Sequence, residues 1–183
     1  MSIGRREREL MNQIAEKCVR SSLDPKSLDA LLGKAYGSSC SGCKHDEPRL
    51  SLIYELICFE SFLGMCLSGA IQDLGDIAQA PAFMARYIAK CAPGELIEAV
   101  LKQETAAGKE TLSKFVRVTE ERLSKYLKAA ARDLGSEIGI FGNQVREVLA
   151  ECECDGSNLD DALLADTLLS GLRQCIEQSQ KRS

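Results

Sequence analysis

The chain has 183 residues, of which 45% are hydrophobic and 27% are charged, so it is long enough to bury one sizeable core in a single domain over residues 1–183. Its net charge of -4 argues against nucleic acid and anionic membrane surfaces as partners, because both are bound through clustered Lys and Arg. Nine cysteines without a visible secretory signal predict a reducing, cytoplasmic location, where thiols fill cores, bind metal or sense redox state.

Helical patterns dominate the first part of the chain, and strand patterns are nearly absent. A first helix is expected over about residues 5–20. A second helix is expected between Asp24, which can cap it, and Gly37, which can end it. A third is expected to begin near Pro48, because proline fits the first turn of a helix.

The longest apolar run, LSLIYELICFESFLGMCLSGAI, approaches the length of a membrane span but contains Glu55 and Glu60. An ionised carboxylate at mid-bilayer costs about 2–3 kcal/mol, so we expect the central helix of a bundle and no membrane span. Helical spacing places Glu60 in the middle of an apolar stripe and Glu55 on the opposite face, toward solvent or another helix. Glu60 is therefore predicted to be a buried carboxylate with an arginine partner, and the candidates are Arg86, Arg117, Arg122, Arg132 and Arg146.

The second half of the chain continues the helical pattern. Pro81 and Pro93 each indicate the first turn of a short helix. A long helix follows, with an apolar seam formed by Leu112, Val116, Thr119, Leu123, Tyr126 and Ala130. Gly135, Gly139 and Gly142 predict a kink or break, followed by a helix through Leu149. A last helix, capped by Ser157 or Asn158, presents the apolar face Leu164, Leu168, Leu172 and Ile176. The fold class is therefore all-α: a single-domain bundle of about seven or eight helices.

Two loops, near residues 37–47 and 152–158, carry cysteines in close pairs. The candidate metal ligands are Cys40 and Cys43, Cys152 and Cys154, and the neighbouring His45. Four such ligands suit tetrahedral zinc, provided that the fold brings the two loops together. Two other interpretations stay open, namely loops with free thiols and a reversible redox pair. By contrast, the helical cysteines Cys58, Cys66, Cys91 and Cys175 are expected to act as small hydrophobic residues.

The inventory of reactive groups favours binding over catalysis. The single histidine leaves no Ser-His-Asp set, and no phosphate-binding glycine loop follows a strand. Our main hypothesis is a non-enzymatic helical module, such as an adaptor, assembly factor or regulator, that binds a protein partner or a second copy through amphipathic helices and is stabilised or regulated by a Cys-based zinc site. One alternative is a metal-handling or thiol-redox sensor protein. The other is a helical enzyme that uses buried Glu60 as a general acid or base.

Overall fold

The computed structural model describes residues 3–36, 46–68, 74–102, 108–133, 135–151 and 159–181. Within these ranges the chain forms eight helices and no strand, which confirms the predicted all-α bundle. The helices are α1 (Arg5–Leu23), α2 (Pro25–Tyr36), α3 (Asp46–Leu67), α4 (Leu74–Cys91), α5 (Gly94–Leu101), α6 (Lys109–Arg132), α7 (Ser136–Glu151) and α8 (Asp161–Lys181).

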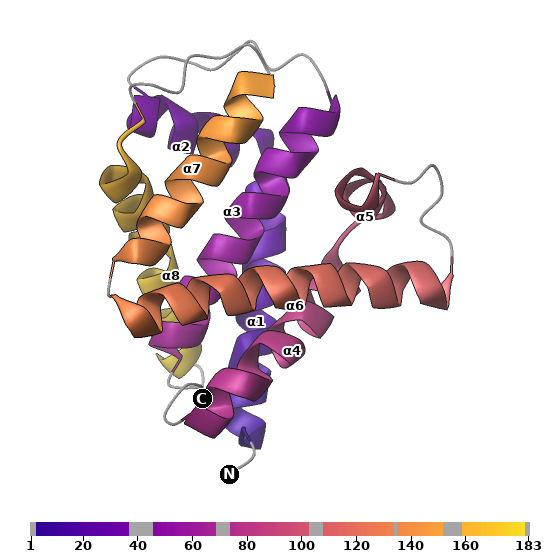
Figure 1. Ribbon diagram of the computed structural model, residues 1–183. Coiled ribbons are helices and arrows are strands. Elements are labelled where there is room, and N and C mark those ends of the chain that lie inside the picture. Colours follow the sequence, from indigo (N-terminus) through magenta and orange to yellow (C-terminus); the bar gives the residue numbers. More distant parts are fainter. Residues whose placement is uncertain are drawn as a thin grey trace.

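Helix α3 lies at the centre of the bundle and contacts α1, α4, α5, α6, α7 and α8 (Figure 1). Helix α6 crosses in front of α3, while α7 runs alongside it (Figure 1). Among the described helices, α3 is the one long and apolar enough to cross a membrane, over Pro48–Leu67, but 72% of its apolar window is buried inside the bundle. This burial agrees with the prediction of a central core helix.

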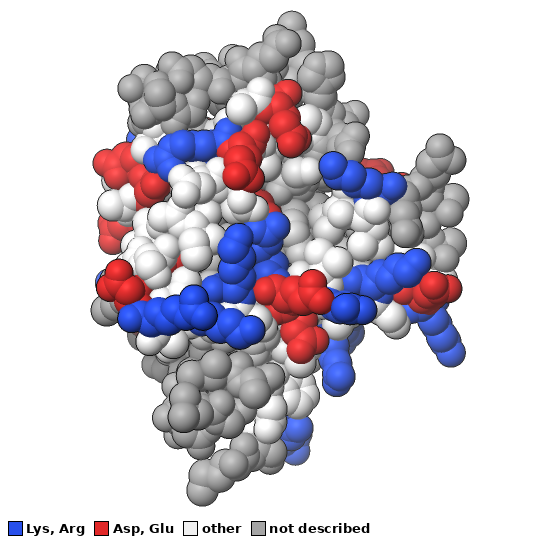
Figure 2. Space-filling model, in the orientation of Figure 1, with Lys and Arg blue, Asp and Glu red and all other residues white. Residues whose placement is uncertain are grey.

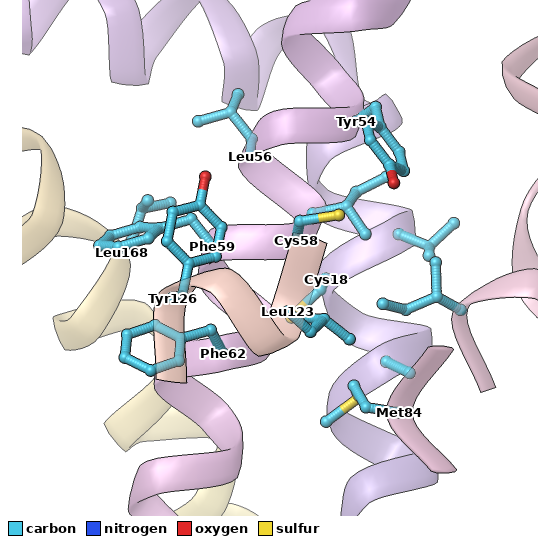
Figure 3. Packing of buried hydrophobic residues seen from close by; sticks show 14 of the residues in the cluster. Cys18, Tyr54, Leu56, Cys58, Phe59, Phe62, Met84, Leu123, Tyr126 and Leu168 are labelled. Atoms are coloured by element: carbon cyan, nitrogen blue, oxygen red, sulfur yellow. The ribbon is translucent and has the colours of Figure 1, made fainter. Parts of the chain in front are cut away.

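Aromatic side chains hold α6 and α7 against α3. The ring of Phe59 stacks on Phe141 of α7 at a centroid distance of 4.0 Å, and it meets Tyr126 of α6 edge to face at 5.3 Å. Phe62 lies 5.7 Å from Tyr126, so the three helices share one aromatic cluster. Figure 3 shows its members Phe59, Phe62 and Tyr126. Such pairs contribute roughly 0.5–1.5 kcal/mol each beyond their burial.

Several predicted helix ends are confirmed by the backbone. Asp24 precedes α2, and its Oδ2 accepts hydrogen bonds from the backbone N–H and the hydroxyl of Ser27, at 3.1 and 2.6 Å. Pro93 caps α5. The cap of α8 differs from the prediction, because Asp160 accepts the backbone N–H of Leu163 at 2.9 Å. Ser157 and Asn158 lie outside the described residues.

Of two predictions about helix breakers, one is wrong and the other is confirmed in part. Pro81 lies inside α4 rather than at its start, because the buried face of α4 against α1 and α6 outweighs the loss of one backbone hydrogen bond. The chain breaks at Gly135, which has φ 101°, but Gly139 and Gly142 are helical residues of α7. Packing therefore overrides the weak helix propensity of these two glycines.

The buried face of α6 is rotated from the predicted seam in its first half. Leu112 is 43% exposed, whereas Thr111 and Phe115 are buried. From Thr119 onward the prediction is correct, since Leu123 and Tyr126 are buried against α3. The predicted face of α8 is also confirmed, with Leu164, Leu168, Leu172 and Ile176 buried.

Candidate functional site

Glu60 lies on α3 and is 2% exposed, as the sequence predicts for a buried carboxylate. Its Oε1 forms an ion pair with the ammonium of Lys17 on α1, and its Oε2 lies 3.4 Å from the hydroxyl of Ser21. The predicted arginine partner is wrong. The reason is the packing order, since α1 lies directly against α3 and the long stem of Lys17 reaches inward.

An open groove lies over this ion pair, where α1, α2 and α8 meet above α3. It has a volume of about 270 Å³, and we call it the Lys17–Glu60 groove. Leu28, Ala30, Leu31, Leu56 and Leu168 provide its apolar surface; Ser21, Ser22, Ser27, Lys34 and Thr167 provide polar groups beside the ion pair. The lining therefore combines leucine side chains with hydroxyl groups, one neutralised charge pair and the ammonium of Lys34.

Gly171 of α8 also lines this groove and keeps it open. A Cβ at this position would lie 3.6 Å from Nζ of Lys17, so a larger side chain there would occupy space in the groove. A second, larger hollow of about 560 Å³ continues along α1 and shares Lys17, Ser21 and Ser27 with the first. The two hollows form one continuous surface across the α1–α2 corner.

A second buried carboxylate belongs to Glu55, which is 5% exposed. Its Oε1 lies 3.2 Å from Nη2 of Arg122, and the hydroxyl of Tyr126 donates to its Oε2 at 3.1 Å. Of the two predicted environments for Glu55, solvent is wrong and another helix is correct, because both partners lie on α6. Burial raises the pKa of the Glu55 carboxyl, although Arg122 and Tyr126 act in the opposite direction.

The described cysteines differ in burial. Cys58 is fully buried, as predicted, and so is Cys18; burial raises the pKa of both thiols and disfavours the reactive thiolate. Figure 3 shows both within the packed core. The prediction for Cys66 is wrong, since it lies exposed near the end of α3, and Cys91 is half-buried. The side chain of Cys175 lies outside the described residues.

The predicted metal ligands also lie outside the described residues. This applies to Cys40, Cys43 and His45, and equally to Cys152 and Cys154. Among the residues that are described, no group of three or more His, Cys, Asp or Glu side chains is arranged to hold a metal ion. The zinc hypothesis therefore stays a prediction from the sequence.

The chemistry available to Glu60 is limited by its partner. A carboxylate that acts as a general base must accept a proton from substrate, and here one of its oxygens already contacts the ammonium of Lys17. The groove itself was missed by sequence reasoning. Its only sequence signal is the serine-rich segment that contains Ser21 and Ser22 at the end of α1, next to the start of α2.

Comparison with known proteins identifies no relative. No family model, no curated protein and no solved structure matches this chain.

Proposed function

We propose that this protein is a helical protein-binding module, an adaptor, assembly factor or regulator of the cytoplasm, and that the Lys17–Glu60 groove receives a segment of its partner. The observation that carries the proposal is the lining of this groove, in which leucines of α2, α3 and α8 face an opening edged by hydroxyl groups. Grooves of this kind accept the apolar side chains of a helical or extended segment, while the polar edge fixes its orientation.

The open shape of the groove favours a peptide over a cofactor. The groove opens to the surface and continues into the second hollow along α1, so it does not enclose a ligand as small-molecule sites usually do. It has room for one or two aliphatic side chains of a partner. Glu60 and Lys17 neutralise each other, so they give the floor polarity without demanding a charged ligand.

Affinity purification from the cells that produce the protein tests this proposal, with a groove-filling variant as the discriminating arm. Gly171→Leu places a side chain in the groove, whereas Gly139→Leu places the same side chain on the exposed face of α7, where a Cβ meets nothing within 4 Å. We expect partner proteins to copurify with the unmodified chain and with Gly139→Leu, and to be lost with Gly171→Leu. A strict monomer without partners that turns over a small molecule would contradict the proposal.

We infer a second, metal-dependent role from the placement of four helix ends. Helix α2 ends, α3 begins, α7 ends and α8 begins at the same end of the bundle (Figure 1). These helix ends adjoin the segments that carry Cys40, Cys43, His45, Cys152 and Cys154. Zinc bound by four of these side chains would join the second connection of the chain to the last one and stabilise the fold.

Elemental analysis of protein purified without a tag tests the metal proposal. We expect about one equivalent of zinc, together with about four thiols that react with a thiol reagent only after treatment with a chelator. If zinc, iron and copper are all found at trace levels only, the metal proposal is contradicted. The same outcome would leave the partner-binding role of the groove unaffected, because the groove contains none of these residues.

A further inference from the structure

Helix α6 carries positive charge on an acidic protein. It contains seven Lys or Arg and three Asp or Glu, whereas the whole chain has 23 basic and 27 acidic residues. The remainder of the chain therefore has a clear excess of acidic residues. Figure 2 shows basic side chains along the visible face of α6, with acidic ones between them.

Four of the seven basic side chains of α6 line a groove beside α7. This groove has a volume of about 700 Å³, and we call it the cationic groove. It is lined by Arg117, Glu120, Glu121, Ser124, Lys125, Lys128, Ala129 and Arg132 of α6 and by Ile140 of α7. These α6 residues lie on the face opposite Phe115, Leu123 and Tyr126, which are buried in the core.

Three cations of this groove are free to bind a partner. Arg117 already forms an ion pair with Glu121 at 3.1 Å, whereas Lys125, Lys128 and Arg132 form no ion pair with any described residue. They follow one another along one stripe of the helix, because spacings of three and four residues keep side chains on the same face. The stripe from Arg117 to Arg132 is about 22 Å long at 1.5 Å per residue.

We propose that the cationic groove binds an acidic segment of a protein partner. The argument is charge complementarity together with the apolar contribution of Ala129 and Ile140, which lie between the charges and can contact apolar side chains of the segment. A stripe of this length matches about six or seven residues of extended chain. The surface lies on different helices from the Lys17–Glu60 groove.

The same face disfavours nucleic acid. Duplex DNA carries one negative charge per about 1.7 Å, and such a continuous row of phosphates would lie against Glu120 and Glu121. Carboxylates in a peptide are spaced by intervening residues, so the segment can place them beside the cations and away from these two glutamates. The alternation of charge on α6 therefore selects a peptide over a polyphosphate backbone.

Titration of the full ¹⁵N-labelled chain, followed by NMR, provides the test. The probe is a short peptide in which Glu alternates with Leu and Ser, and the comparison probes are the same peptide with Lys in place of Glu, single-stranded RNA, and vesicles that contain anionic lipid. We expect the acidic peptide to shift the amide signals of residues 124–132 and of Ile140, with an affinity that decreases as salt increases. The Lys peptide is expected to cause no such shifts.

Matched charge reversals separate a local site from a general charge effect. The triple variant Lys125→Glu, Lys128→Glu, Arg132→Glu is expected to bind the acidic peptide at least about tenfold more weakly. The control is Arg86→Glu, Lys90→Glu, Arg173→Glu, which makes the same change in net charge at exposed positions outside the groove. It is expected to change binding by less than about twofold.

Three results would overturn the proposal. They are equal weakening in both triple variants, stronger binding of RNA or of anionic vesicles than of the acidic peptide, and amide shifts outside the groove. None of these results affects the test of the Lys17–Glu60 groove, because neither Gly171 nor Gly139 lines the cationic groove.

Discussion

The ammonium of Lys17 on α1 contacts the carboxylate of Glu60 on α3, at the floor of a groove that opens to the surface. Glu60 is almost completely buried, while the side chain of Lys17 remains 27% exposed. The pair therefore joins two helices of the core and also forms part of a surface that a partner can reach. It links the stability of the bundle to the shape of the proposed binding site.

Removing one member of this pair is expected to destabilise the fold. Lys17→Met leaves the carboxylate of Glu60 buried without its cation, which lowers the free energy of unfolding by about 3 kcal/mol. The double variant Lys17→Met, Glu60→Met removes both charges at similar volume and is expected to recover most of this loss. Urea denaturation of the single and double variants measures both effects.

The control for this cycle is the exposed pair Arg5–Glu9, whose side chains are 89% and 61% exposed. Arg5→Met is expected to cost little or nothing, because water screens such pairs. If Lys17→Met costs no more than Arg5→Met, the pair with Glu60 does not stabilise the core.

The hydroxyl of Tyr126 is expected to stabilise the protein through its bond to Glu55. Tyr126→Phe keeps the ring that packs on Phe59 but removes the donor from a buried carboxylate, so the free energy of unfolding should fall by about 1–3 kcal/mol. Tyr87→Phe is the control, because Tyr87 is half-buried and its hydroxyl forms no hydrogen bond with any described residue. Equal decreases in Tm for Tyr126→Phe and Tyr87→Phe would show that the hydrogen bond from Tyr126 to Glu55 adds no stability.

Glu55 also predicts a pH dependence. Burial raises the pKa of its carboxyl in the folded protein, so the folded chain binds this proton more tightly than the unfolded chain. The resulting stabilisation is fully present below the ordinary pKa of about 4.3 and is lost as pH rises through the raised value. Glu55→Gln, which cannot ionise, should therefore become more stable relative to the unmodified chain as pH rises from about 4.3 toward neutral.

Urea denaturation across this pH range measures the stability difference between Glu55→Gln and the unmodified chain. Glu151→Gln makes the same substitution at an exposed position and is measured alongside as the matched control. A constant difference for Glu55→Gln, or a change in the opposite direction, would contradict a raised pKa at Glu55.

Substitution by alanine is expected to have opposite effects on stability at two glycines, Gly64 and Gly139. A Cβ on Gly64 of α3 would lie 2.5 Å from Cγ2 of buried Ile14 on α1. Gly64→Ala should therefore destabilise the α1–α3 contact by about 1–3 kcal/mol. The higher helix propensity of alanine offsets part of this cost. Gly139→Ala meets nothing within 4 Å and should stabilise α7 by up to about 1 kcal/mol. Thermal unfolding of both variants should shift in opposite directions; two shifts of the same sign would show that the close approach at Gly64 is relaxed.

The local features of the fold are readable from the sequence, whereas the contacts between distant helices are not. The cap at Asp24, the helix start at Pro93 and the apolar face of α8 all depend on neighbouring residues, and each is confirmed. Glu60 was correctly placed in an apolar stripe, because helical periodicity alone decides which face it occupies. Its partner depends on which helix packs there, and this information is absent from local spacing.

The same limit explains the misplaced face of α6 and the missed groove. Leu112 fits the seam by spacing, but Thr111 and Phe115 are buried instead, and the ring of Phe115 lies 5.9 Å from that of Tyr54 on α3. The Lys17–Glu60 groove requires α8 to meet α1 and α2, and α8 is separated from these two helices by much of the chain. A surface made by residues so distant in sequence has no local pattern.

Site-specific photo-cross-linking in living cells tests the central claim most directly. A photoreactive amino acid at Ala30, an exposed residue of α2 that lines the Lys17–Glu60 groove, should give a discrete protein adduct that disappears in the Gly171→Leu background. The same amino acid at Ala150, an exposed alanine of α7 outside both grooves, should give no such adduct. Equal cross-linking at both positions, or an adduct at Ala30 that persists after the groove is filled, would contradict a partner bound in this groove.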